Sequence, residues 1–66
     1  MQITLNGKPR DVADAMTVTG LLQQLGLHAM RVAVQVNLDI IKREQYDATV
    51  LKPEDKVEVL TFMAGG

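Results

Sequence analysis

Only one stretch of this chain has apolar residues at the spacing of a helix, and that stretch is short. Its apolar positions are Val18, Leu21, Leu22 and Leu25. Thr17 is the predicted N-cap, with Thr19 as a rival, because a hydroxyl there accepts a hydrogen bond from a free amide of the first turn. Gly26 suits the C′ position, where the backbone takes a positive φ. A helix of about eight residues is unstable alone in water, so this one must dock on a sheet.

The chain begins with the pattern of a β-hairpin. Apolar and polar residues alternate from Met1 to Leu5, which predicts a strand with one buried face. Asn6-Gly7 follows, and this dipeptide is favoured in two-residue turns because both positions need a positive φ. The returning strand, residues 8–12, contains Pro9, which cannot donate a hydrogen bond to a neighbouring strand. We therefore expect residues 8–12 at an edge of the sheet.

A second pair of strands is expected after the helix, beyond a loop at residues 27–30. Residues 31–37 carry valine at alternate positions, which predicts a strand with one face on the core. Residues 37–39 are predicted to turn the chain, and Ile40-Ile41 to begin a short return strand. A charged connection follows at residues 42–47.

The last strand is expected over residues 56–62, after a turn at residues 52–55. Val57 and Val59 share its core face, and the residues on its other face are Glu58, Leu60 and Phe62. The order of elements predicts an α+β fold, with a mixed four- to five-stranded sheet and one helix packed on one face. At 66 residues, the chain is expected to be one domain, 1–66.

The composition argues against several classes of function. The chain has no cysteine, so it holds no disulfide, thiolate nucleophile or Cys-ligated metal. Its seven basic residues are scattered and its net charge is −1, which argues against a nucleic acid partner. No apolar run approaches the ~18 residues of a membrane span, and no targeting segment is visible. We therefore expect a cytoplasmic protein with no membrane contact and no metal site.

Residues 63–66 end in two glycines and carry the strongest indication of function. Glycine lacks a Cβ, so Ala64 and Gly65 suit a segment that threads the narrow active site of a partner. The pattern predicts a flexible tail at residues 63–66, with the α-carboxylate of Gly66 accessible to another enzyme. An inert terminus is the alternative, because chain ends are often small and unordered.

Five segments together resemble a known family. They are the Asn6 turn, Thr17–Leu22, Val34–Asn37, Lys42–Tyr46 and the final strand that runs into Ala64–Gly66. The chain resembles the ThiS family, the small sulfur carriers of thiamine biosynthesis. This resemblance implies a β-grasp, ubiquitin-like fold. Two positions depart from the family pattern: Leu38 stands where glycine is common, and Glu54 stands where a Gly-Asp turn is usual.

The resemblance also implies a chemistry. An E1-like adenylating enzyme would use ATP and Mg²⁺ to activate the carboxylate of Gly66, and a persulfide sulfur donor would convert the adenylate into a thiocarboxylate. Thiazole synthase would then take the sulfur. In this scheme the chain is a co-substrate of its partners. It has no catalytic side chain and binds no cofactor itself.

A partner interface is predicted at Leu60, Phe62 and Met63. These side chains would lie on the open face of the sheet, just ahead of the tail, where exposed apolar residues mark an interface. The alternative is that Leu60 and Phe62 pack under a loop. His28 is expected to be a surface loop residue, because no second metal ligand neighbours it. Tyr46 is expected at the rim of the core.

Three other functions are compatible with the sequence. The first is a sulfur carrier for another pathway, such as molybdopterin or another thio-metabolite, and only its partners would differ. The second is a ubiquitin-like modifier, which would form isopeptide bonds with lysines of other proteins. The third is an interaction domain whose Gly-Gly end has no role, in which case removal of Gly66 would change nothing.

Overall fold

The computed structural model describes residues 1–62. This part of the chain contains five strands, one α-helix and two short 3₁₀ helices. In chain order they are β1 (Gln2–Leu5), β2 (Lys8–Asp11), α1 (Val18–Leu25), η1 (Ala29–Arg31), β3 (Val32–Val36), β4 (Asp39–Ile41), η2 (Arg43–Gln45) and β5 (Lys56–Thr61). The predicted order of strands and helix is confirmed. The loop expected at residues 27–30 is wrong in part, since Ala29 begins η1, and the charged connection contains η2.

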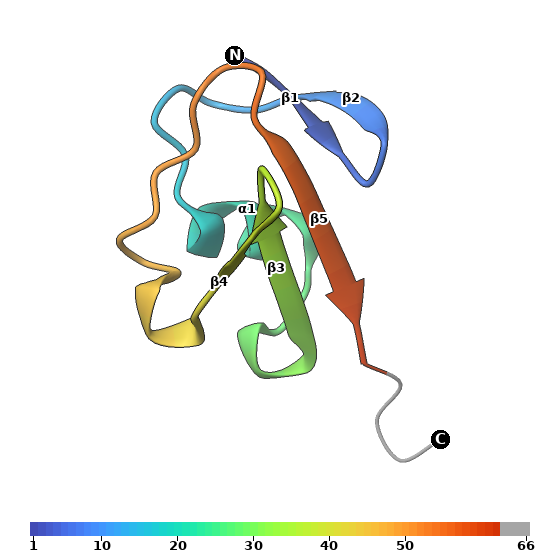
Figure 1. The fold of residues 1–66 in the computed structure, drawn as a ribbon. Helices are drawn as coiled ribbons and strands as arrows, with labels where there is room; N and C mark the ends of the chain where they lie inside the picture. The colour runs from blue at the N-terminus through green and yellow to red at the C-terminus, as the bar shows by residue number, and fades with distance from the viewer. Residues whose placement is uncertain (63–66) are drawn as a thin grey trace.

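The five strands form one mixed sheet in the order β2-β1-β5-β3-β4 (Figure 1). β1 and β5 run parallel, while the other neighbouring strands are antiparallel. β2 lies at an edge of the sheet, which confirms the position expected from Pro9. β5 lies at the centre, between β1 and β3, and it is the last element before residues 63–66.

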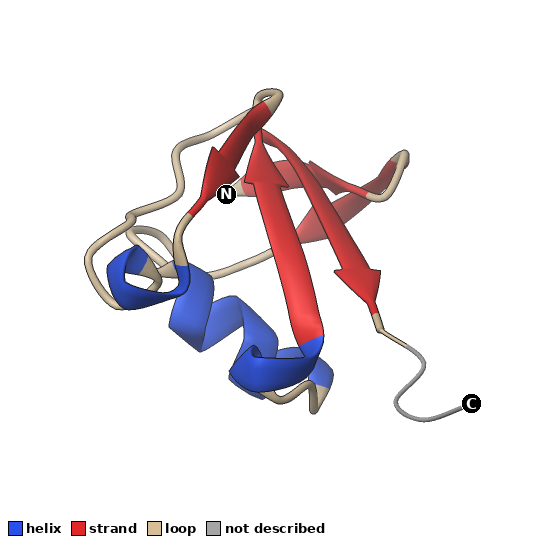
Figure 2. Ribbon diagram, turned by 60° about the horizontal axis from the view of Figure 1, so that its bottom comes forward, coloured by secondary structure: helices blue, strands red, loops and turns tan. Residues whose placement is uncertain are grey.

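The helix α1 begins and ends where the sequence predicts. Thr17 is the N-cap, and its Oγ1 accepts a hydrogen bond of 3.0 Å from the amide of Gly20. Thr19 is not a cap, and its hydroxyl donates to the carboxylate of Asp47. Gly26 ends the helix at a φ of 72°. Because α1 has only eight residues, its stability comes from packing against one face of the sheet (Figure 2).

The core lies between α1 and the sheet. Its buried side chains are Ile3, Val12, Val18, Leu21, Leu22, Val32, Val34, Tyr46, Leu51, Val57 and Val59. Tyr46 lies inside the core and not at its rim, since it is only 4% exposed. The reason is that η2 turns the chain back toward α1, where the amide of Thr19 donates to the carbonyl of Tyr46 over 3.2 Å.

Two asparagines in tight turns fix β5 in the sheet from either side. Asn6 has a φ of 50°; its Nδ2 donates to the carbonyl of Val59 over 3.2 Å, and its Oδ1 accepts from the amide of Val59 over 2.8 Å. Asn37 has a φ of 51°, and its Oδ1 accepts from the amide of Lys56 over 2.9 Å. Each side chain thus continues the hydrogen bonding of a strand that has already ended.

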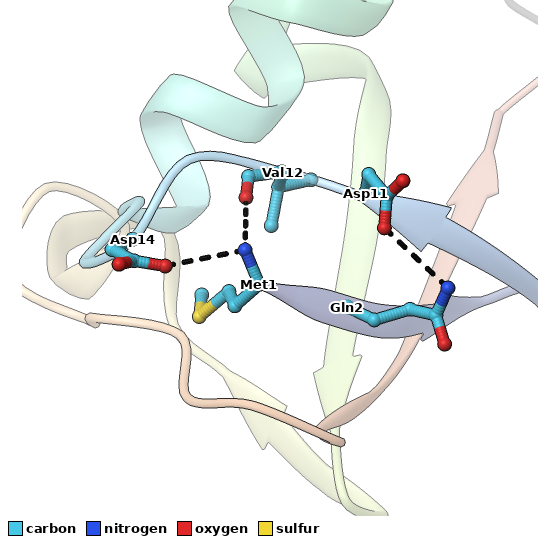
Figure 3. Close-up of polar contacts among 5 residues, drawn as sticks. All are labelled: Met1, Gln2, Asp11, Val12 and Asp14. Atoms are coloured by element: carbon cyan, nitrogen blue, oxygen red, sulfur yellow. Dashed lines mark hydrogen bonds and ion pairs between the residues drawn. The ribbon is translucent and has the colours of Figure 1, made fainter.

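The first residue is tied to the segment that follows β2 (Figure 3). The α-ammonium of Met1 donates to the carbonyl of Val12 over 2.7 Å and forms an ion pair of 3.2 Å with Asp14. Nearby, Nε2 of Gln2 donates to Asp11 over 3.4 Å. These contacts close the β1–β2 hairpin at the end opposite its turn, so β1 is held in place beside β5.

Candidate functional site

The candidate site lies at the end of β5. Val32 of β3 pairs with Thr61, and the amide of Phe62 donates to the carbonyl of Arg31 over 2.9 Å. Residues 63–66 follow directly in the sequence. In Figure 1 the β5 arrow points away from the N-terminus. The point from which the C-terminal segment starts is therefore fixed by β3 and by the 3₁₀ turn η1.

The face of β5 that turns away from the core carries exposed apolar side chains. Leu60 is 61% exposed and Phe62 is 55% exposed, whereas Val57 and Val59 on the other face are buried. The expectation that Leu60 and Phe62 lie on the open face of the sheet is confirmed, and the alternative that they pack under a loop is wrong. Exposed apolar residues of this kind can mark an interface, and the partner interface at Leu60 and Phe62 stays a prediction.

Ile40 of β4 is a further exposed residue on this face, and it was not predicted from the sequence. Ile40 is 74% exposed and lies opposite Gln35, which in turn lies opposite Glu58 of β5. Residues directly opposite each other share a face, so Ile40 belongs to the same open face as Leu60. Leu38, in the turn before β4, is 87% exposed. The presence of Leu38 in a predicted turn was the feature of the sequence that could have indicated exposed apolar surface beside β4.

The remaining predicted site residues lie outside the described part of the chain. They are Met63, Ala64, Gly65 and Gly66. The accessible carboxylate of Gly66 and the threading role of Ala64 and Gly65 therefore stay predictions.

The other polar residues have local structural roles. His28 is exposed, and its Nδ1 caps η1 by accepting from the amide of Met30 over 3.1 Å. Asp55 accepts from the amide of Lys52 over 2.8 Å and from Nδ2 of Asn37 over 2.9 Å, so it closes the turn before β5. Within residues 1–62, no group of three or more acidic or histidine side chains is arranged to hold a metal ion. None of the helices described is long and apolar enough to cross a membrane.

Solved structures of similar sequence share this fold. The crystal structure of a thiamine biosynthesis protein (ThiS) from Geobacter metallireducens is 45% identical and superimposes with a TM-score of 0.86, over the full length of both chains. A solution NMR structure of a thiamine biosynthesis protein from the same organism gives a TM-score of 0.83 and covers this whole chain and 88% of that one. The β-grasp arrangement implied by the resemblance is thus confirmed for the described residues.

Sequence relatives fall into two groups. The sulfur carrier protein ThiS of Escherichia coli K12 is 32% identical over the full length of both chains. Two proteins named thiazole synthase, from Paramagnetospirillum magneticum and Magnetococcus marinus, are 36% and 41% identical over 66 residues. This whole chain spans only 20% of the length of each thiazole synthase. A model of the ThiS family matches residues 3–66, and on this match and these relatives the chain belongs to the ThiS family.

Proposed function

We propose that this chain is a sulfur carrier in thiamine biosynthesis and that it acts as a co-substrate, not as an enzyme. The observation that carries the proposal is the likeness to the E. coli sulfur carrier protein ThiS over the full length of both chains. The family match supports it, because that match extends to residue 66 and so includes both terminal glycines.

The proposed reaction takes place at the carboxylate of Gly66. A carboxylate is a poor electrophile, so one of its oxygens must first become part of a good leaving group. An E1-like enzyme joins that oxygen to AMP, using ATP with Mg²⁺ and releasing pyrophosphate. The sulfur of a persulfide donor then attacks the carbonyl carbon and displaces AMP, and a thiol that cleaves the S–S bond leaves the thiocarboxylate. Because this chain has no cysteine, it offers no side-chain thiol on which the sulfur could travel instead.

Two surfaces of the chain take part in this proposal. Leu60 and Phe62 are exposed on the open face and, with Met63, form the docking surface for the adenylating enzyme. Ala64 and Gly65 pass through the narrow entrance of that enzyme, since side chains this small offer little steric hindrance.

We assign thiazole synthase as the acceptor of the sulfur. Support comes from the two relatives of that name, in which a segment similar to this whole chain makes up a fifth of the polypeptide. Two modules joined in one polypeptide meet at a high effective concentration, which favours a pair that works together. The same observation favours thiamine synthesis over the molybdopterin route, where a different acceptor would be needed.

Intact mass spectrometry tests the proposal. The chain is incubated with ATP, Mg²⁺, an E1-like enzyme that loads ThiS proteins, and sulfide as the sulfur source. We expect one oxygen to be replaced by sulfur, in the peptide that contains Gly66. A variant without Gly66 is the matched control and should stay unmodified. A full-length chain that stays unmodified, or that appears only in isopeptide adducts with lysines, would contradict the sulfur-carrier function.

A further inference from the structure

We propose that Asn6 is a site of spontaneous deamidation, and that the hydrogen bonds between its side chain and β5 suppress this reaction in the folded chain. The reaction consumes only water and needs no partner protein. It therefore goes beyond the sulfur-carrier function and stands or falls independently of it.

The Asn6-Gly7 dipeptide has the chemistry that this modification requires. The backbone nitrogen of Gly7 attacks Cγ of Asn6 and loses its proton, and the new C–N bond closes a succinimide ring. The bond between Cγ and Nδ2 breaks, and Nδ2 leaves as ammonia. Water then opens the ring at either carbonyl and leaves aspartate or isoaspartate, with no oxidation or reduction. Because glycine has no Cβ, no side chain shields the attacking nitrogen.

The fold holds the Asn6 amide group in an arrangement that opposes this attack. Oδ1 accepts a hydrogen bond of 2.8 Å from the amide of Val59, and Nδ2 donates over 3.2 Å to the carbonyl of Val59. The attack makes Cγ tetrahedral and expels Nδ2, so neither hydrogen bond survives it. Reaction therefore requires that the side chain first leaves the central strand of the sheet.

Burial does not protect this turn, so the hydrogen bonds to β5 must do so. Asn6 and Gly7 are both exposed. Apart from its chain neighbours, no atom lies within 4 Å of the place where a Cβ of Gly7 would stand. Water thus reaches the turn in the folded chain. The backbone attaches the same turn to β5, since the amide of Asn6 donates to the carbonyl of Val57 over 2.9 Å.

Asn37 provides a comparison within the same chain. Its φ is 51° against 50° at Asn6, and its side chain is also bonded at both ends, to Lys56 and Asp55. The residue that follows it is Leu38, whose branched side chain shields the attacking nitrogen. The two asparagines therefore share a turn geometry and differ in the reactivity of the next amide.

Deamidation at Asn6 should weaken the sheet irreversibly. A carboxylate has no N–H to donate, so the part-buried carbonyl of Val59 loses its bond from this side chain. Isoaspartate also adds a carbon atom to the main chain of a tight turn. We therefore expect the modified chain, once separated from the unmodified one, to unfold at a lower urea concentration.

Peptide mapping by mass spectrometry tests the proposal on the whole chain at neutral pH. In denaturing guanidinium chloride we expect aspartate and isoaspartate to accumulate at Asn6, while Asn37 stays unmodified over the same period. Without denaturant the rate at Asn6 should be at least about tenfold lower, as for two hydrogen bonds that must break first. Gly7→Ala is compared in denaturant alone, where folding has no influence, and should slow the reaction several-fold.

A second measurement separates the bonds to Val59 from the rest of the fold. Because the amide of Val59 donates to Oδ1 of Asn6, its hydrogen exchange reports release of this side chain. In guanidinium chloride below the unfolding transition, deamidation at Asn6 and exchange at Val59 should rise by the same factor. Equal deamidation rates in folded and unfolded chain would overturn the proposal. It would also be overturned by an unreactive Asn6 in denaturant, or by a deamidation rate that does not follow exchange at Val59.

Discussion

At the scale of single residues, Leu38 occupies a backbone conformation that is unfavourable for leucine. Its φ is 73°, and left-handed geometry costs an L-residue with a Cβ roughly 1–2 kcal/mol. Burial returns little of this free energy, because the side chain is 87% exposed. In the sequence, Leu38 departs from a family pattern with glycine at this position. In the structure the chain still turns between β3 and β4, with leucine at this position.

We predict that Leu38→Gly raises the free energy of unfolding by about 0.5–1 kcal/mol, because glycine accepts a positive φ without a clash. Leu38→Ala is the matched control, since it removes the same exposed side chain but keeps the Cβ. Its free energy of unfolding should stay within about 0.5 kcal/mol of wild type. Urea denaturation measures all three proteins. The strain at Leu38 would be disproved if the glycine variant were no more stable than the alanine variant.

At the scale of elements, the central strand β5 depends on asparagine side chains as well as on its neighbouring strands. β1 pairs with β5 only up to Leu5 and Val57. Beyond that point the side chain of Asn6 forms the hydrogen bonds to β5, with both the amide and the carbonyl of Val59. Asn6 therefore has two functions, because it also adopts the positive φ of the turn. Glycine could perform the second function and not the first.

We predict that Asn6→Gly lowers the free energy of unfolding by about 1–3 kcal/mol, since it leaves the part-buried amide and carbonyl of Val59 without these bonds. The sign is opposite to that expected for Leu38→Gly, although both place glycine at a positive φ. Asn6→Asp keeps the acceptor and loses the donor, so its loss should be smaller. Urea denaturation gives the free energies, and amide exchange at Val59 should be fastest in the glycine variant. Equal stability of wild type and Asn6→Gly would show that only the turn matters.

At the scale of the whole molecule, the helix and the strands could be predicted from short stretches of sequence. Which residues lie on the open face depends instead on how distant strands pair. Asn6-Gly7 and Thr17 determine a turn and a helix start from their own side chains, so both could be predicted from the sequence. The pairing of β1 with β5 joins opposite ends of the chain, and only the family resemblance implied it. The open-face position of Ile40 depends on its register against Gln35, because a one-residue slip would turn the side chain to the core.

The candidate site shows the same division. Alternation along β5 predicted that Leu60 and Phe62 lie on the face away from the core. Whether a loop covers that face depends on the rest of the fold, so their exposure could not be predicted from the strand alone. The hydrogen bond between Arg43 and Ala29 could not be predicted, since nothing in the sequence indicates which backbone carbonyl an arginine side chain will reach. The site is thus a surface on β5 and β4, and the chemistry at Gly66 stays a prediction.

Docking on the open face leads to the last prediction. Phe62→Ala should raise KM of loading about tenfold, because truncating an apolar anchor at an interface costs ~1–2 kcal/mol, and it should leave kcat unchanged. Its free energy of unfolding should change little, since Phe62 is 55% exposed. Val50→Ala is the matched control: Val50 is 49% exposed, but it bridges to Thr17 and does not belong to the face of Leu60. Steady-state loading assays measure both variants. If Phe62→Ala is loaded with the KM of wild type, Phe62 is not an anchor for the adenylating enzyme, because truncation of an anchor weakens binding by more than about 1 kcal/mol.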